Sequence, residues 1–271
     1  MAASSLKHRD IKDQPGFMTM AIVCLAVLYA PILILMVWSL NSGSIVTHWE
    51  GISLSWYGVA LMNEEFHSAA INTMIIAVSA TILSTLMATM AAIGMTRVKP
   101  WRGIGPSFMV INLPLMVPEI ITAVATLSFF ALLAGWFNLN FGIGNIIIAH
   151  TVFCIPFAYM PIRARLEDMD LTLENAAADL YATPWNTFRR VTFPLLMPGI
   201  FSGMALAFIV SFDDFTITQL IAGPGQTTLP LYIWNQIRRP MTPEINAIST
   251  ILLLISILFV SVSFLIARRR K

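Results

Sequence analysis

Three carboxylates interrupt long apolar stretches of the chain, and packing alone does not explain them. They are Glu119, Asp213 and Asp214. A charged side chain at the middle of a bilayer costs about 2.5 to 3.5 kcal/mol even on a lenient insertion scale, so such residues usually face a cavity and have a role. Carboxylates that line a pathway between apolar walls favour cations. We therefore treat these acids as a candidate cation pathway.

Helical spacing connects the acids to hydroxyl side chains. Ser211, Asp214 and Thr218 fall at i, i+3 and i+7, which predicts that they share one face of a helix. Glu119, Thr122 and Thr126 repeat this spacing on a second predicted helix. Two polar stripes with one carboxylate each could line a single pathway.

The adjacent aspartates are not equivalent on a helix. Asp213 is turned by about 100° from Asp214, so both cannot point at the same axis, and we favour Asp214. A structural role stays open for all three acids. They could instead bond backbone groups or a partner subunit, for instance where a helix breaks near Pro118.

The elements that must position these acids are transmembrane helices. Of 271 residues, 57% are hydrophobic and 11% are charged, whereas a soluble domain carries about 25% charged residues. About 20 apolar residues at about 1.5 Å each cross a hydrocarbon core of about 30 Å. We predict an all-α, polytopic membrane protein with six transmembrane helices at about 17–40, 69–95, 108–137, 143–162, 199–221 and 247–267.

Two of the predicted regions are irregular. Asn112, Pro114 and Pro118 interrupt the third span, so we expect a broken helix that needs protein or water around it. The loop at 222–246 is rich in Gly and Pro but also carries aromatic and aliphatic residues. We expect this loop to be folded and partly membrane-dipping, with Trp234 as an interfacial anchor.

The basic residues predict the orientation. Every Lys and Arg except Arg238 and Arg239 falls in the tails, or in the loops on the same side of the predicted spans. The positive-inside rule makes that side cytoplasmic, so both termini are expected in the cytoplasm. The resulting organisation is a tail at 1–16, a transmembrane domain at 17–267 with a cytoplasmic loop at 163–198, and a tail at 268–271. Because these residues do not gather on one face, we expect no nucleic acid partner.

The cytoplasmic loop has the pattern of a short helix pair. Leu173, Ala176, Ala177 and Leu180 form one apolar face of a first helix that is expected to end near Tyr181. Small side chains let another backbone come close, which favours a protein partner on this face. The alternative is an amphipathic helix that rests on lipid headgroups.

The second helix of the pair has its own start signal. Thr183 can serve as the N-cap with Pro184 at the first helical position, and we expect the helix to run through Arg190. Pro194 and Pro198 close the unit before the next span.

This loop resembles the EAA loop of ABC importer permeases, in which a Glu-Ala-Ala triplet is followed after three residues by Gly. Asn175, Ala176 and Ala177 stand at the triplet, Tyr181 stands at the Gly position, and Glu174 comes one position early. From the Tyr we expect that this turn needs no positive φ. The resemblance implies an ABC importer permease fold with a cytoplasmic coupling helix that docks on an ATP-hydrolysing subunit. The implied contact residues are Glu174, Asn175, Ala176, Ala177, Asp179, Leu180 and Tyr181.

A narrower resemblance is to the spermidine/putrescine permease subgroup. It is carried by the segments 116–119, 211–214, 223–230 and 243–247. It implies alternating-access import of a polyamine-like cation through a bacterial inner membrane. The implied partners are a dimer of ATP-binding subunits, a second permease subunit, and a periplasmic solute-binding protein that docks near Trp234 and Glu244. Related permeases carry other solutes, such as iron or opines, so the solute stays open.

Other functional classes fit the sequence poorly. An intramembrane protease needs two acids brought together from separate helices, and no Gly-x-Gly-Asp pattern occurs. An ion-driven secondary transporter would show an internal repeat, and none is evident. No phosphate-binding loop occurs, so ATP hydrolysis is expected in a separate subunit. We expect no catalytic residue, cofactor or metal in this chain, and expect the lone His150 to make a helix-to-helix hydrogen bond.

Overall fold

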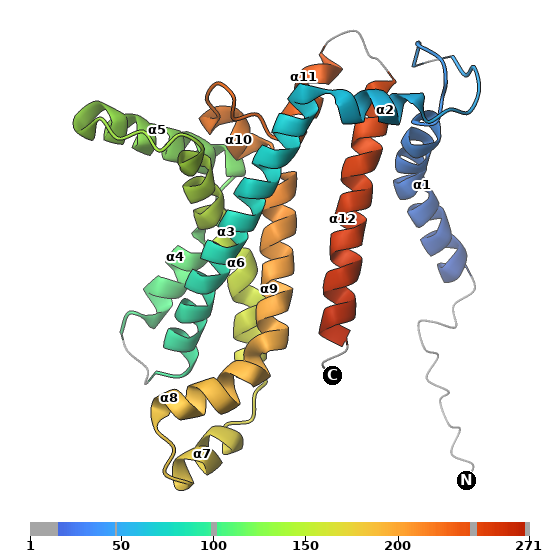
Figure 1. The fold of residues 1–271 in the computed structure, drawn as a ribbon. Helices are drawn as coiled ribbons and strands as arrows, with labels where there is room; N and C mark the ends of the chain where they lie inside the picture. Colours follow the sequence, from blue (N-terminus) through green and yellow to red (C-terminus); the bar gives the residue numbers. More distant parts are fainter. Residues whose placement is uncertain (1–15, 47, 99–101, 239–242, 269–271) are drawn as a thin grey trace, which may run out of the picture. The chain divides into compact units, whose positions relative to one another are not determined.

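The computed structural model describes residues 16–46, 48–98, 102–238 and 243–268, which are helical apart from turns and one isolated bridge between Asn41 and Ile52 (Figure 1). The chain divides into two compact units. One unit consists of Met1–Ala60 and Pro240–Ile251, and the other of Leu61–Arg239 and Leu252–Lys271. The predicted tails fall largely outside the described residues.

The first unit contains α1 (Phe17–Trp38), the start of α2 (Ser55–Met62) and the start of α12 (Glu244–Arg268). No residue of α1 is buried, and a helix that is apolar all round is suited to lipid. The loop after α1 is held by Asn41, whose Oδ1 accepts a hydrogen bond from the Glu50 N–H at 2.9 Å. This unit therefore supplies a lipid-facing helix with a closed loop at its end.

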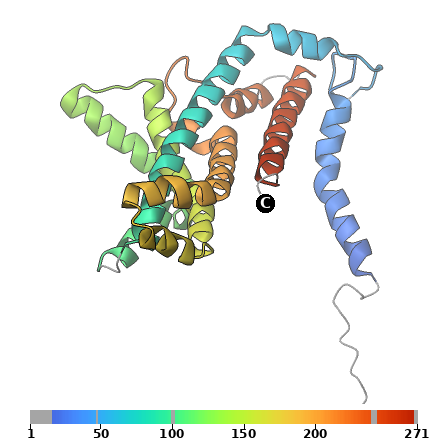
Figure 2. The ribbon, with the colours of Figure 1, turned by 60° about the horizontal axis from the view of Figure 1, so that its bottom comes forward.

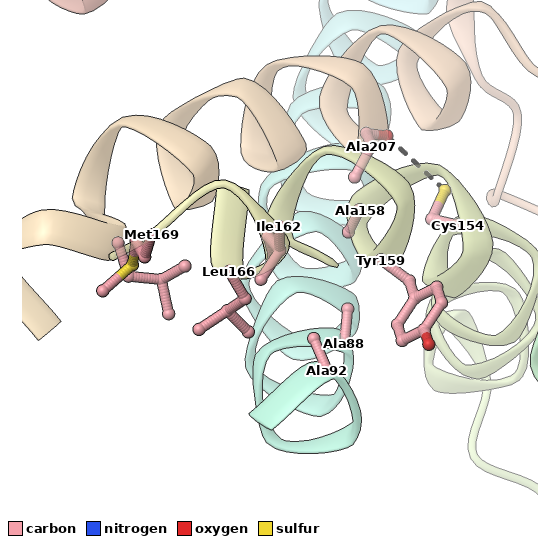
Figure 3. Close-up of a cluster of buried hydrophobic side chains, with 10 residues drawn as sticks. Ala88, Ala92, Cys154, Ala158, Tyr159, Ile162, Leu166, Met169 and Ala207 are labelled. Atoms are coloured by element: carbon pink, nitrogen blue, oxygen red, sulfur yellow. Dashed lines mark hydrogen bonds between the residues drawn. The ribbon is translucent and has the colours of Figure 1, made fainter. Parts of the chain in front are cut away.

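Three long helices form the core of the second unit. They are α3 (Glu64–Thr96), α6 (Ile143–Glu167) and α9 (Phe193–Asp213), which pack against one another. Figure 3 shows the small side chains of Ala88, Ala92, Ala158 and Ala207 at this packing, beside larger ones from α6. Small residues let membrane helices approach closely, which is how such helices gain packing energy without a hydrophobic driving force.

The third predicted span is a broken helix, as expected. It consists of α4 (Ile104–Met116) and α5 (Glu119–Phe137), and the chain between them is extended, with ψ of 136° at Val117 and 132° at Pro118. Pro114 lies inside α4 without ending it. The break places Glu119 in the first turn of α5, where the positive end of the helix dipole favours a carboxylate.

The fifth predicted span, 199–221, is wrong at both ends. Helical structure begins earlier, with α8 (Pro184–Thr187) and a π-helical turn (Phe188–Thr192) that lead into α9. Helix α9 then stops at Asp213, and 216–221 is a separate helix, α10 (Thr216–Ile221). No Gly or Pro marks this second break, so local sequence patterns did not predict it.

The remaining spans agree with the prediction in number and order. Within the described residues, five helical segments are long and apolar enough to cross a membrane, while α4 and the apolar part of α12, Glu244–Phe259, are shorter. The outer loop is folded, because it contains α11 (Leu229–Ile237) with Leu229 and Tyr232 buried. Whether the loop dips into the membrane stays a prediction.

The close approach of α9 to α6 gives a first prediction. A Cβ atom added at Gly203 would lie 2.7 Å from the Ala158 carbonyl oxygen, whereas one added at Gly94 would meet nothing within 4 Å. We expect Gly203→Ala to destabilise the protein by about 1 to 3 kcal/mol through overpacking, and Gly94→Ala to be neutral or slightly stabilising. Thermal unfolding of the two purified variants in one detergent measures this. Equal midpoints would contradict the packing.

Candidate functional site

A buried imidazole joins three polar side chains inside the helical core. His150 of α6 is 1% exposed. Its Nδ1 lies 2.8 Å from the Ser211 Oγ, and its Nε2 lies 3.0 Å from the Thr218 Oγ1 and 3.2 Å from the Asp214 Oδ1. The helix-to-helix role expected for His150 is therefore confirmed, and it reaches two elements, α9 and α10.

The predicted common helical face of Ser211, Asp214 and Thr218 is wrong. Helix α9 ends at Asp213, and Asp214 lies in extended backbone with ψ of 129° before α10. The three side chains nevertheless meet, because His150 bonds to all of them. Sequence reasoning missed this pairing, although an acid and a lone histidine in neighbouring apolar spans could have signalled it.

Asp214 uses its two carboxylate oxygens differently. Its Oδ1 contacts the His150 Nε2 and also accepts hydrogen bonds from the Thr218 N–H at 3.0 Å and the Thr218 Oγ1 at 3.2 Å. The bond from the Thr218 N–H satisfies a backbone donor in the first turn of α10. The other oxygen, Oδ2, is buried and has no hydrogen-bond partner in the described part of the chain. A buried acceptor without a donor is costly, so Oδ2 marks a place where an incoming donor would be stabilised.

Asp214 borders a pocket of about 380 Å³ between the start of α5, the middle of α6, the end of α9 and the start of α10. Glu119 lies beside Asp214 and Thr216 and is half-buried, while Asp213 is exposed. The pocket combines two carboxylates near each other, a hydroxyl and aromatic rings, all of which attract ammonium groups. It is lined by Glu119, Phe153, Phe157, Ile209, Val210, Asp213, Asp214, Phe215 and Thr216.

Thr122 is not part of this pocket. It lines a separate and almost entirely apolar pocket of about 600 Å³ formed by α4, α5 and α6. The stripe predicted from Glu119 to Thr122 thus divides between two cavities, since Glu119 borders the first pocket while Ile121 and Thr122 border the second. A role for Thr122 in a pathway stays a prediction.

The cytoplasmic loop forms the predicted helix pair (Figure 2). Its first helix is α7 (Thr172–Asp179), which packs against α8. Thr183 caps α8 by accepting a hydrogen bond from the Asn186 N–H, with Pro184 at the first position. The second helix was expected to run as an α-helix through Arg190, but it changes to π-helical geometry after Thr187.

The expectation that the turn at Tyr181 needs no positive φ is wrong. Tyr181 has φ of 57°, the left-handed conformation that glycine adopts most easily. This conformation closes the end of α7, because the Ala182 N–H reaches the Ala177 carbonyl at 3.0 Å. The structure therefore keeps the backbone that the family's glycine would favour, with a Tyr in its place.

One face of the helix pair is exposed and apolar. Leu180 is 81% exposed and Tyr181 is 96% exposed, while Leu173 and Trp185 are also exposed and α7 has no buried residue. Asn175, Ala176 and Asp179 are exposed as well, and Ala177 is half-buried. Before α7, the Thr172 N–H donates to Asp170 and holds the pKa of that carboxyl below its usual value. An exposed patch of this kind is suited to a protein contact.

Glu174 differs from its neighbours on α7, because it points toward the membrane helices. Its Oε1 lies 3.1 Å from the Arg97 Nε and 3.0 Å from the Thr192 Oγ1. It was expected among the contacts to an ATP-hydrolysing subunit, but in this structure its carboxylate binds residues of its own chain.

The two residues expected to contact a binding protein fall in different units. Trp234 of α11 packs against Phe215, with ring centroids 5.0 Å apart. The guanidinium carbon of Arg238 lies over the Trp234 ring, 5.0 Å from the ring centroid. Glu244 opens α12 in the first unit. Docking at either residue stays a prediction.

These features define the class of protein. A bundle of apolar helices that holds a carboxylate pocket and presents an exposed apolar helix pair fits a membrane transport protein. Residues 80–269 match the family described as "Binding-protein-dependent transport system inner membrane component". The chain belongs to this family.

Characterised relatives cover most of the chain. It is 39% identical over 229 residues to the putrescine transport system permease protein PotI of Escherichia coli strain K12, which covers 83% of this chain and 81% of the relative. It is 33% identical over 255 residues to the spermidine/putrescine transport system permease protein PotC of the same strain, with 93% of each chain covered.

Solved structures agree with the fold. A bacterial ABC transporter that imports the acidic polysaccharide alginate contains a chain with a TM-score of 0.69 at 19% identity, with 93% of each chain covered. The inward-facing MetNI methionine ABC transporter gives a TM-score of 0.62 at 16% identity, with 78% of this chain and 100% of that chain covered. The ABC importer permease fold is thus shared at low sequence identity.

His150 gives the second prediction. His150→Leu removes a hydrogen-bonding partner from Ser211, Thr218 and Asp214 together. Thr218 and Asp214 still bond to each other, but the Ser211 hydroxyl loses its partner, and a buried group left unpaired costs about 1 to 3 kcal/mol. We expect a lower midpoint of thermal unfolding for the purified variant. The exposed His48 provides the control, since His48→Leu should leave the midpoint unchanged. An unchanged midpoint for His150→Leu would rule out the network as a stabilising element.

Tyr181 gives the third prediction. A non-glycine residue in the left-handed conformation costs about 1 to 2 kcal/mol, so Tyr181→Gly should relieve strain while Tyr181→Val should increase it. Amide exchange of α7 reports the difference: we expect slower exchange in the glycine variant than in the valine variant. The opposite order would show that this turn does not need a positive φ.

Proposed function

We propose that this chain is the permease subunit of an ATP-driven importer whose substrate is a polyamine-like cation such as putrescine or spermidine. The observation that carries the proposal is the orphan Oδ2 of Asp214 beside Glu119, in a pocket with three phenylalanines. A primary ammonium group has three N–H donors and a positive charge. It offers the donor that the Asp214 Oδ2 lacks and a positive charge for the two carboxylates, while the aromatic rings can contact both the charge and the methylenes that follow it.

The named substrates of the relatives support the same assignment. PotI is described as a putrescine permease and PotC as a spermidine/putrescine permease. Putrescine is a diamine and spermidine a triamine, so both carry the ammonium groups and methylenes that the carboxylates and aromatic rings of the pocket are suited to contact. Iron and opines, which other permeases handle, are the alternative solutes.

The mechanism we propose is alternating access. A periplasmic solute-binding protein delivers the cation, and Trp234 and Glu244 are the docking candidates on this chain. A dimer of ATP-binding subunits engages α7 and the turn at Leu180 and Tyr181, whose exposed apolar surface favours that contact. Closure of this dimer moves the helix pair and reorients the spans. The pathway then lies between this chain and a second permease subunit, with both termini in the cytoplasm.

The fourth prediction tests the cation site. Asp214→Asn and Glu119→Gln remove charge without changing size, and a hydrogen bond to a charged group contributes about 1.5 to 3 kcal/mol, so apparent affinity for putrescine should fall about ten- to a hundredfold. The matched control is Asp213→Asn, since Asp213 is exposed at the pocket edge and should change affinity least. Uptake by the complete complex in proteoliposomes measures all three.

Two results would contradict the proposal. Equal affinity for putrescine in the wild type and in the Asp214→Asn and Glu119→Gln variants would show that these two carboxylates do not form the cation site. Uptake that persists without the ATP-binding subunits and ATP would identify a secondary transporter instead. Competition by spermidine, iron chelates and opines in the same assay identifies the solute class.

A further inference from the structure

We propose that the ion pair between Glu174 and Arg97 is a clamp that transmits movement of the coupling helix α7 to the transmembrane core. The proposal assigns to Glu174 a positioning role inside this chain, in place of a direct contact with the ATP-binding subunit. It rests on the proposed coupling role of α7.

The clamp joins the ends of four elements. Arg97 caps the C-terminal end of α3, and its Nη2 donates to the Leu166 carbonyl in the last turn of α6 at 3.0 Å. Its Nε binds Glu174 in the first turn of α7. The same carboxylate oxygen of Glu174 accepts a hydrogen bond from Thr192, at the end of the π-helical turn that leads into α9. One ion pair thus links α7 to each of the three helices that form the core.

The electrostatics at this junction favour a cation and an anion in these positions. Arg97 lies at the C-terminal ends of α3 and α6, where the helix dipoles are negative, and Glu174 lies near the positive end of α7. The pair is mostly shielded from water, with side chains 16% and 19% exposed. It is therefore less screened than a surface ion pair, and its loss leaves a partly buried charge.

Helix α7 has little else to hold it to the core. None of its residues is buried, and it packs against α8 and the π-helical turn. Figure 1 shows α7 and α8 together beyond the ends of α3, α6 and α9. Without a polar clamp, a push on the exposed face of α7 would tilt this small helix instead of moving the long ones.

The chain provides a matched control pair. Arg163 and Glu167 form an ion pair of 2.7 Å within α6, with side chains 33% and 54% exposed. This pair has the same residue types and lies near the same end of the core, but it joins two positions of one helix. Its removal should therefore leave the movement of α7 relative to the core unchanged.

The fifth prediction compares Glu174→Ala with Glu167→Ala in the complete complex. We expect Glu174→Ala to retain the ATP-binding subunits while putrescine transported per ATP hydrolysed falls about tenfold, the factor that corresponds to about 1.4 kcal/mol. Amide exchange of α7 in the same complex should become faster. Glu167→Ala should match the wild type in both measurements.

Two results would overturn the clamp. One is an unchanged transport ratio in Glu174→Ala. The other is loss of the ATP-binding subunits from that variant, which would make Glu174 a docking residue. If the wild-type complex carried no putrescine, the proposed substrate would fail. The comparison of α7 amide exchange would still decide on the clamp, because it needs no substrate.

Discussion

The need to satisfy a buried carboxylate organises the middle of this membrane protein. Asp214 lies among apolar helices, where an unpaired charge is among the most expensive features a chain can carry. Its cost is offset on one side by His150 and by the start of α10, which both bind Oδ1. The break between α9 and α10 exists where this carboxylate turns inward. Asp214 also borders the pocket, so the residue that stabilises the helix break is also the one that we propose to bind a cation.

A permease must also connect such a site with a source of energy, and two physical properties of the core serve this purpose. Close contact between small residues, such as Gly203 against Ala158, holds α6 and α9 together as one body. The ends of the core helices then meet at Arg97, which binds both the α6 carbonyl and α7. In the proposed mechanism, movement of the exposed helix pair is therefore transmitted to α9, and to Asp214 directly after it, by helices that move as rigid bodies.

The sequence predicted the parts of this structure that depend on local pattern. Apolar run lengths predicted the order of the spans, Pro118 predicted the break before Glu119, and Thr183 with Pro184 predicted the start of α8. Prediction from the sequence failed where contacts between residues far apart in the chain determine the local structure. Nothing local marks the end of α9 at Asp213, since His150, which stabilises the break by binding Asp214, lies 64 residues before Asp214. Tyr181 adopts a conformation that its residue type disfavours, and Glu174 turns inward to a helix end far away in sequence.

The most direct test of the account is the structure of the complete transporter, with both permease subunits and the ATP-binding dimer, trapped with putrescine. We expect an ammonium group within hydrogen-bonding distance, about 3 Å, of the Asp214 Oδ2, with Glu119 on its other side and His150 still bound to Oδ1. Putrescine bound elsewhere in the pathway, with Asp214 Oδ2 in contact with protein atoms alone, would contradict it.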